Sequence, residues 1–164
     1  MDELIARLAA GAAGMEGLRA NVVGREPWPL SDAYGAEPES DWGPKEVIAH
    51  VAEMMPFWLG QVEDIIATPA GGDAPAFGRV ATDPHRIARI GEDRLLPADE
   101  LFDRVAGGAT DVERRMAELT PAELGRTGVH VRLGEMTVPA ILERFLVSHV
   151  EEHVRQLREV IARD

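Results

Sequence analysis

Apolar side chains recur every three or four positions along four long segments of the chain. These segments cover about residues 2–21, 44–66, 97–119 and 137–163. Spacings of three and four place the apolar side chains on one face of an α-helix, where they can pack against a common core. The pattern therefore predicts an all-α protein whose four helices form a four-helix bundle, folded as a single domain over residues 1–164.

The segments between these helices are long and differ from one another. Residues 23–42 are rich in Pro, Gly, Asp and Glu, which favours a loop. Asp83 is followed by proline, and this pair is typical of the start of a helix, so a short helix is predicted there. Residues 120–123 have the sequence of a capping box around a single turn, and residues 125–136 show an extended pattern. Because the connections are long, the four helices need not alternate in direction.

Charge and composition exclude several classes of function. The 164-residue chain carries a formal net charge of −12, which repels nucleic acid and anionic membrane surfaces. It contains no cysteine, which excludes disulfides, thiolate metal sites and a cysteine nucleophile. No apolar run approaches the roughly 18 residues that span a bilayer, and the acidic N-terminus lacks the basic start of a signal peptide. We therefore expect a cytoplasmic protein that binds neither nucleic acid nor membranes.

Three histidines lie on the predicted inward faces of two helices. His149 and His153 are four residues apart, so both imidazoles project from one face of the last helix, within its apolar stripe. His50 lies in a similar apolar stripe of the second helix. Buried imidazoles are costly unless something satisfies them, and neutral imidazole is a common metal ligand. The pattern predicts one divalent ion (zinc, nickel or iron) on His50, His149 and His153, with an open position for water or substrate.

Two other interpretations of these histidines stay open. A single inward histidine is more often a hydrogen-bonded core residue than a metal ligand, so only the convergence of all three favours a metal site. Residues 149–153 also match the H-x-x-E-H motif of inverted zinc peptidases, which requires a further ligand on a later segment. Only eleven residues follow His153, which disfavours that motif here.

Other polar residues lie near the predicted site in the sequence. Glu53, Glu152 and Gln156 are close enough to hold the outer ring nitrogens of the histidines, as metal-bound imidazoles require. His130 belongs to the extended segment before the last helix; we expect it in an exposed loop, although from there it could reach the cavity. His85 falls in the first turn of the short helix and is expected at the surface.

The residues around the three histidines resemble those of a known family. A helix start led by Trp42 is followed eight residues later by His50, and the last helix carries His149-x-x-x-His153-x-x-Gln156. From the first helix to the C-terminus, the chain resembles the DinB-like superfamily. This resemblance implies an up-down-down-up four-helix bundle, often a homodimer, with a divalent ion on His50, His149 and His153.

Members of that superfamily with known activity include bacillithiol S-transferases and the N-terminal domain of mycothiol-dependent maleylpyruvate isomerase. The isomerase has an additional C-terminal domain for which this chain has no room, which disfavours its activity here. The resemblance thus implies a metal-dependent enzyme that transfers a low-molecular-weight thiol to an electrophilic small-molecule substrate. Two alternatives stay open: a hydrolase that uses a metal-activated water, and a non-catalytic metal-binding protein of the stress response. The sequence identifies no catalytic residue beyond the predicted ligands.

Overall fold

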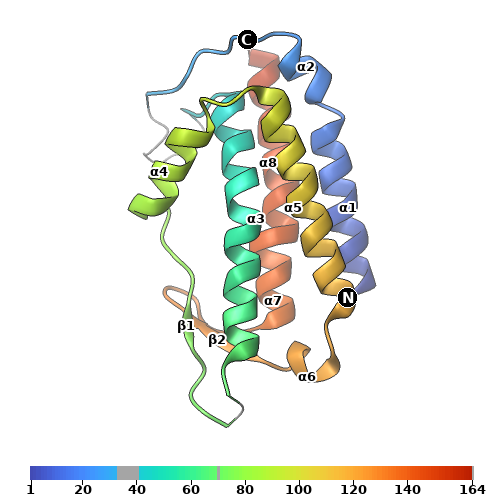
Figure 1. The fold of residues 1–164 in the computed structure, drawn as a ribbon, viewed down its shortest axis with the longest axis vertical. Helices are drawn as coiled ribbons and strands as arrows, with labels where there is room; N and C mark the ends of the chain where they lie inside the picture. The colour runs from blue at the N-terminus through green and yellow to red at the C-terminus, as the bar shows by residue number, and fades with distance from the viewer. Residues whose placement is uncertain (33–40, 70, 164) are drawn as a thin grey trace.

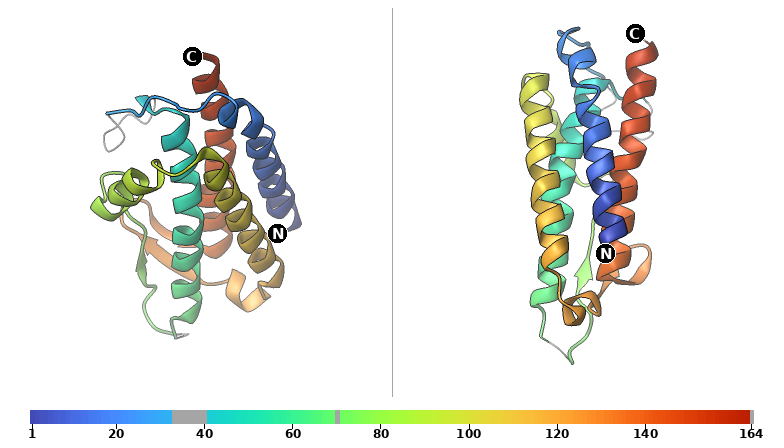
Figure 2. Two further views of the ribbon diagram at one scale, coloured as in Figure 1. Left: turned by 45° about the horizontal axis from the view of Figure 1, so that its top comes forward. Right: turned by 90° about the vertical axis from the view of Figure 1, so that its right-hand side faces the viewer.

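The computed structural model describes residues 1–32, 41–69 and 71–163. Four long helices lie side by side in it, and Figure 2 shows the same arrangement from two further directions. They are α1 (Asp2–Glu16), α3 (Pro44–Ala67), α5 (Ala98–Glu118) and α8 (Ser148–Arg163). In Figure 1, α1 and α8 run upward whereas α3 and α5 run downward. The predicted helical fold class is confirmed, and the helices have the up-down-down-up directions that the family resemblance implies.

The first helix is shorter than its periodicity predicts. The sequence favours one helix over residues 2–21, but α1 ends at Glu16 and a separate short helix, α2 (Arg19–Val23), follows it. Gly17 closes α1, because its N–H bonds to carbonyl groups of the last turn. Glycine weakens a helix interior and suits a helix end, which explains a break within a continuous apolar pattern.

The core lies between the four long helices. α1 packs against α5 and α8, and α3 packs against the same two helices. Glycines let α1 approach α8 closely: a Cβ added to Gly11 would stand 2.9 Å from Val150, and one added to Gly14 would stand 3.2 Å from Val154. Residues 44–52 of α3 are all buried, so this half of the helix lies deep in the molecule.

The predicted short helices form as well. α4 (Pro84–Asp93) begins where the Asp83 side chain accepts hydrogen bonds from two backbone N–H groups. α6 (Pro121–Leu124) is a single turn closed by the predicted capping box, in which Thr120 and Glu123 bond each other's backbone. Of the predicted loop over residues 23–42, residues 33–40 lie outside the described part of the chain.

A small three-stranded sheet accompanies the helices, on the side of α3 (Figure 1). β1 (Ala76–Phe77) pairs in parallel with β2 (Thr127–His130), and β2 pairs antiparallel with β3 (Gly134–Thr137). The extended pattern of residues 125–136 indicates the β2–β3 hairpin but gives no sign of β1. A strand of two residues has no periodicity of its own, so only the folded chain reveals it.

The last helix changes its winding just before the histidine pair. α7 (Val138–Leu142) leads into a π-helical segment, η2 (Glu143–Val147), which leads directly into α8. At the end of η2, the Ser148 N–H bonds to the carbonyl of Glu143, five residues back instead of four. The helix predicted over residues 137–163 is therefore continuous, but the apolar pattern does not reveal its π-helical turn.

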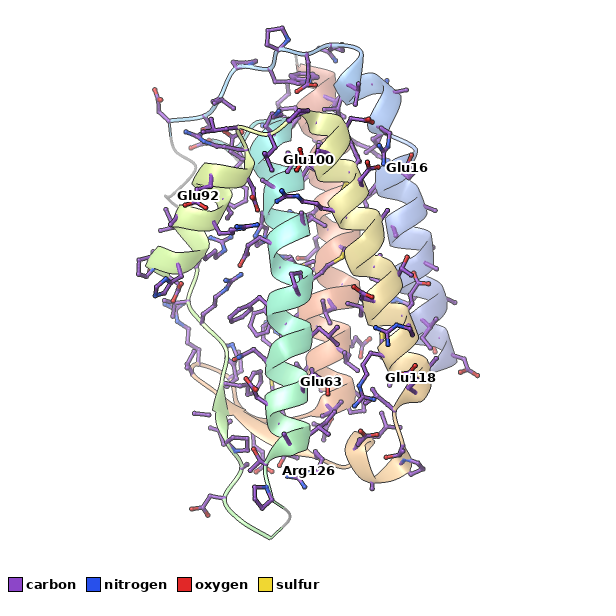
Figure 3. The ribbon with its side chains drawn as sticks, in the orientation of Figure 1. Glu16, Glu63, Glu92, Glu100, Glu118 and Arg126 are labelled. Carbon is purple, nitrogen blue, oxygen red and sulfur yellow. The ribbon has the colours of Figure 1, made fainter. Side chains whose placement is uncertain are left out.

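Charged side chains cover the outer faces of the helices. Figure 3 shows Glu16 near the end of α1, Glu92 on α4, and Glu100 and Glu118 at opposite ends of α5. All four carboxylates belong to exposed residues, in keeping with the net charge of −12. In the described part of the chain, no helix combines the length and the apolar character that crossing a bilayer demands.

Candidate metal centre

Three imidazole rings meet between α3 and α8. His50 comes from the buried half of α3, while His149 and His153 come from the first turns of α8. The Nε2 atoms of His50 and His149 are 3.3 Å apart, and one ring nitrogen of each histidine lies within 4.8 Å of the other two. The structure thus brings together all three predicted residues, and their nitrogens lie where one metal ion can be held.

Burial disfavours protonation of His50 and His149. His50 and His153 are 1% and 4% exposed, while His149 is partly exposed. Burial lowers the pKa of His50 well below its usual value, and it lowers the pKa of His149 to about 3. Neighbouring imidazoles and the guanidinium groups of Arg86 and Arg79 lower both pKa values further. A neutral imidazole carries a lone pair on one nitrogen, which is the form that binds metal.

The rings on α8 are oriented by hydrogen bonds on their outer sides. His153 Nδ1 lies 2.7 Å from the side-chain oxygen of Gln156, which accepts its proton. The His149 ring bonds to the backbone of Phe145. An acceptor on the outer nitrogen keeps the ring proton there and turns the lone pair of the other nitrogen inward. Lone pairs that converge on one point favour a cation between them, so this donor set fits a metal ion.

A buried ion pair stands behind His50. Its Nδ1 lies 3.8 Å from a carboxylate oxygen of Glu53, and Arg79 donates to the two oxygens of that carboxylate at 2.6 and 2.5 Å. Of the three residues predicted to support the histidines, Gln156 and Glu53 lie beside them, whereas Glu152 is exposed. Sequence reasoning missed Arg79, because it joins Glu53 from 26 positions away and belongs to no local pattern.

Trp42 contacts His50 from another direction, and Arg86 in turn lies over Trp42. The Trp42 and His50 rings meet edge to face, with centroids 5.5 Å apart. Arg86, on α4, lies over the Trp42 ring at 5.3 Å from its centroid. Trp42 belongs to the motif that resembles the family, but no signal in the sequence connects Arg86 with the site, because the contact joins distant segments.

A cavity opens beside His149. Its volume is about 620 Å³, and it lies where β3, α7, η2 and α8 meet. Its wall combines apolar and polar side chains, namely Met136, Ala140, Phe145, Glu143, Arg144, Ser148 and Glu152. His149 therefore connects the buried imidazole cluster to a space large enough for a small molecule. Another cavity, of about 610 Å³, borders Glu53 between α3, α4 and α5 but none of the three histidines.

The two remaining histidines lie apart from the cluster. His130 is a buried residue of β2, so the prediction of an exposed loop residue was wrong. The ring of Phe77, on β1, lies 5.2 Å from the His130 ring, and the sequence pattern gave no sign of that strand. The His130 Nδ1 accepts hydrogen bonds from the Arg132 and Leu133 backbones, and burial lowers its pKa. His85 is exposed in the first turn of α4, as predicted.

Comparison with known proteins identifies the family of this chain. It finds no curated protein that matches the chain. The sequence profile of the DinB superfamily matches residues 2–157, which extend from α1 into α8 and include His50, His149 and His153. The match covers nearly the whole chain and confirms the family that the residues around Trp42 and the three histidines resemble. The chain therefore belongs to the DinB superfamily.

Proposed function

We propose that this protein is a metal-dependent enzyme that transfers a low-molecular-weight thiol to an electrophilic small molecule. In this proposal His50, His149 and His153 hold one divalent ion, which is zinc, nickel or iron. The observation that carries the proposal is the position of His149, which belongs both to the imidazole cluster and to the wall of the cavity. A molecule in that cavity lies next to the proposed ion.

The number of ligands supports a catalytic ion over a structural one. Structural zinc sites are usually closed by four protein ligands, whereas catalytic sites keep a position for water or substrate. Within the described ranges, the cluster offers three histidines and no fourth metal-binding side chain. This open position favours an enzyme over the non-catalytic alternative.

The surrounding charges favour an anionic sulfur. A bound divalent ion lowers the pKa of a thiol that coordinates it, so that the thiolate forms near neutral pH. Arg79 and Arg86 act on the same space, because their positive charges lower the pKa values of His50 and His149. The same field stabilises a thiolate. Since the chain has no cysteine, the sulfur comes from a cofactor in this proposal.

The proposed reaction forms one carbon–sulfur bond. The thiolate sulfur attacks an electrophilic carbon, the leaving group departs with its bonding electron pair, and the thiol proton passes to water in the cavity. The apolar part of the cavity wall, formed by Met136, Ala140 and Phe145, can hold the hydrocarbon part of the electrophile.

Metal analysis tests the site itself. Protein purified without an affinity tag is expected to hold about one divalent ion per chain. His149→Ala is expected to lose the ion, because two remaining imidazoles bind metal poorly. His85→Ala, which removes an exposed histidine of α4, is expected to retain it. Elemental analysis compares the three proteins, and equal metal content in all of them would overturn the site.

The reaction requires a separate assay. Metal-loaded protein is mixed with a panel of bacterial low-molecular-weight thiols and electrophiles, and S-conjugates are measured by mass spectrometry. The proposal expects at least one conjugate that the wild-type protein forms and His149→Ala does not. Cleavage of esters, amides or lactones without any thiol would assign hydrolysis instead. No turnover in either panel would overturn an enzymatic role.

A further inference from the structure

One side chain holds the π-helical segment η2 from outside. Arg7, on α1, donates to the two carboxylate oxygens of Glu151 at 2.9 and 2.8 Å, to Glu143 at 3.0 Å and to Ser148 at 3.3 Å. Glu143 is the first residue of η2, whereas Ser148 and Glu151 lie in α8, beyond its end. A single guanidinium group therefore joins the two sides of the π-helical turn.

We propose that Arg7 is a positioning residue for the metal centre. By holding η2 in its π-helical form, it keeps His149 and His153 turned toward His50. The inference rests on the proposed metal site and adds to it a residue on a third helix. The hydrogen bonds described for Arg7 run to η2 and α8, so its effect on the imidazoles passes through the helix.

The winding of η2 decides which way α8 faces. A π-helical turn accommodates one more residue than an α-helical turn, and such segments are rare and short. If residues 143–147 wound as an ordinary α-helix, α8 would turn by about 100° about its axis relative to α7. His149 and His153 would then leave the face that meets His50. Because the α-helix is the usual winding, a tertiary contact that favours the π-helical one would affect the direction in which α8 faces.

The position of α1 makes Arg7 suited to this role. One turn beyond Arg7, α1 and α8 are in tight contact, where a Cβ on Gly11 would stand 2.9 Å from Val150. α1 also packs against η2 itself. The planar guanidinium bonds both oxygens of Glu151 at once, which fixes direction as well as distance. The arginine is thus held at its base by helix packing and at its tip by three side chains.

If Arg7 acted on the metal site through its charge alone, its removal would strengthen metal binding, whereas loss of a positioning residue weakens it. Arg7 is a cation, and removing a cation from the neighbourhood of a metal site strengthens metal binding by electrostatics. Loss of positioning weakens metal binding, because the imidazoles no longer converge. The sign of the change in affinity therefore separates the two explanations.

Arg19 provides a matched control. It too links the first part of the chain to acidic side chains, but its partners Glu16, Asp99 and Asp103 lie on α1 and α5, away from η2. Metal-free Arg7→Met and Arg19→Met are titrated with Co²⁺ at a temperature where circular dichroism shows both to be folded. We expect Arg7→Met to bind Co²⁺ about tenfold more weakly than the wild type, with an altered visible spectrum. Arg19→Met is expected to match the wild type in both.

Two conservative variants complete the test. Arg7→Lys keeps the charge but cannot bond both carboxylate oxygens in a fork, so an intermediate Co²⁺ affinity is expected. Glu151→Gln weakens the same contact from the other side and replaces Arg7→Met if that variant does not fold. Unchanged or tighter Co²⁺ binding in the folded Arg7 or Glu151 variants, or an equal loss in Arg19→Met, overturns the role of Arg7. A wild-type protein that binds no Co²⁺ overturns the metal site itself.

Discussion

Each clustered imidazole faces a partner of a different kind on its outer side. His153 uses a side-chain amide of its own helix, His149 uses a backbone group, and His50 faces a carboxylate. The partners of His153 and His149 keep the ring proton on the outer side, so the inward nitrogens of these two rings carry lone pairs before any ion arrives. The Nδ1 of His50 has no hydrogen-bond partner among the described residues. At the scale of single residues, the site is therefore organised in advance, and the folded protein opposes protonation of the rings.

Acidification of the metal-free protein tests this property. The pKa of His149 is about 3 in the folded chain, against 6.5 for an ordinary imidazole. Between these two pKa values, His149 is protonated in the unfolded chain but not in the folded chain. The contribution of His149 to the free energy of unfolding is therefore fully present above the higher pKa value and falls as the pH drops below it. The loss is at most about 1.4 kcal/mol per pH unit for each such histidine.

Urea unfolding of the wild type and of His149→Gln, from about pH 7 to about pH 5, measures this loss. Most carboxylates stay ionised in that window, so the difference between the two proteins belongs to the imidazole. The wild type is expected to lose stability more steeply. Parallel curves would contradict a lowered pKa for His149.

The sequence predicts the histidines better than their surroundings. His149, His153 and Gln156 share one helix, so their spacing alone indicates that they lie on one face. Arg79 lies between β1 and α4, and Arg86 lies on α4. The course of the folded chain brings both residues to the site, and no spacing in the sequence predicts that course. The convergence of the three histidines was therefore predictable, whereas the positive charges around them were not.

At the scale of elements, local departures from regular winding matter more than the apolar pattern. Apolar positions continue at helical spacing beyond Glu16, yet α1 ends there. Apolar positions also keep a helical spacing through η2, although the backbone there is π-helical. β1 is too short to have any pattern, and without it His130 looks like an exposed loop residue. The sequence thus predicted the four long helices and the short helices α4 and α6, but not the separate α2 or the π-helical turn, because these breaks depend on contacts that form only in the folded chain.

Two glycines in helix interiors are expected to respond oppositely to alanine. A Cβ on Gly11 would stand 2.9 Å from the stiff side chain of Val150, whereas one on Gly107 would meet nothing within 4 Å. Alanine is favoured over glycine in a helix by about 1 kcal/mol, so Gly107→Ala is expected to raise the free energy of unfolding by that order. Gly11→Ala is expected to lower it by about 1 kcal/mol, because overpacking exceeds the same gain.

Urea denaturation of both variants measures these changes side by side. Because the two substitutions are chemically identical, the comparison isolates the contact between α1 and α8. Stabilisation by Gly11→Ala would show that α1 can withdraw from α8 at little cost.

At the scale of the whole molecule, charge is distributed unevenly. The outer surface is acidic and the chain carries a net charge of −12, yet the buried guanidinium groups of Arg79 and Arg86 stand beside the imidazole cluster. Most of the surface repels an anion, whereas the interior near the cluster attracts one. This contrast favours a small anionic ligand over a nucleic acid, which would have to contact the outer surface.

A divalent ion that joins α3 to α8 is expected to stabilise the entire bundle. The ion binds a site that the unfolded chain lacks, so the gain follows mass action and reaches about 2.7 kcal/mol at one hundred times the Kd. For a domain of this size, that gain raises Tm by roughly 5–10 °C. Calorimetry with added Zn²⁺ and with a chelator measures it, and His50→Ala is expected to be insensitive to both. Equal Tm values for the wild type under both conditions would contradict the bridge.

His50 and His149 are separated by 99 positions in the chain. Bringing such distant positions together costs loop entropy, so an unfolded chain cannot gather all three imidazoles. Capture of the proposed ion by all three histidines therefore requires that α8 has already packed against α3. Newly made protein would reach its metallated form only after the residues of α8 had left the ribosome.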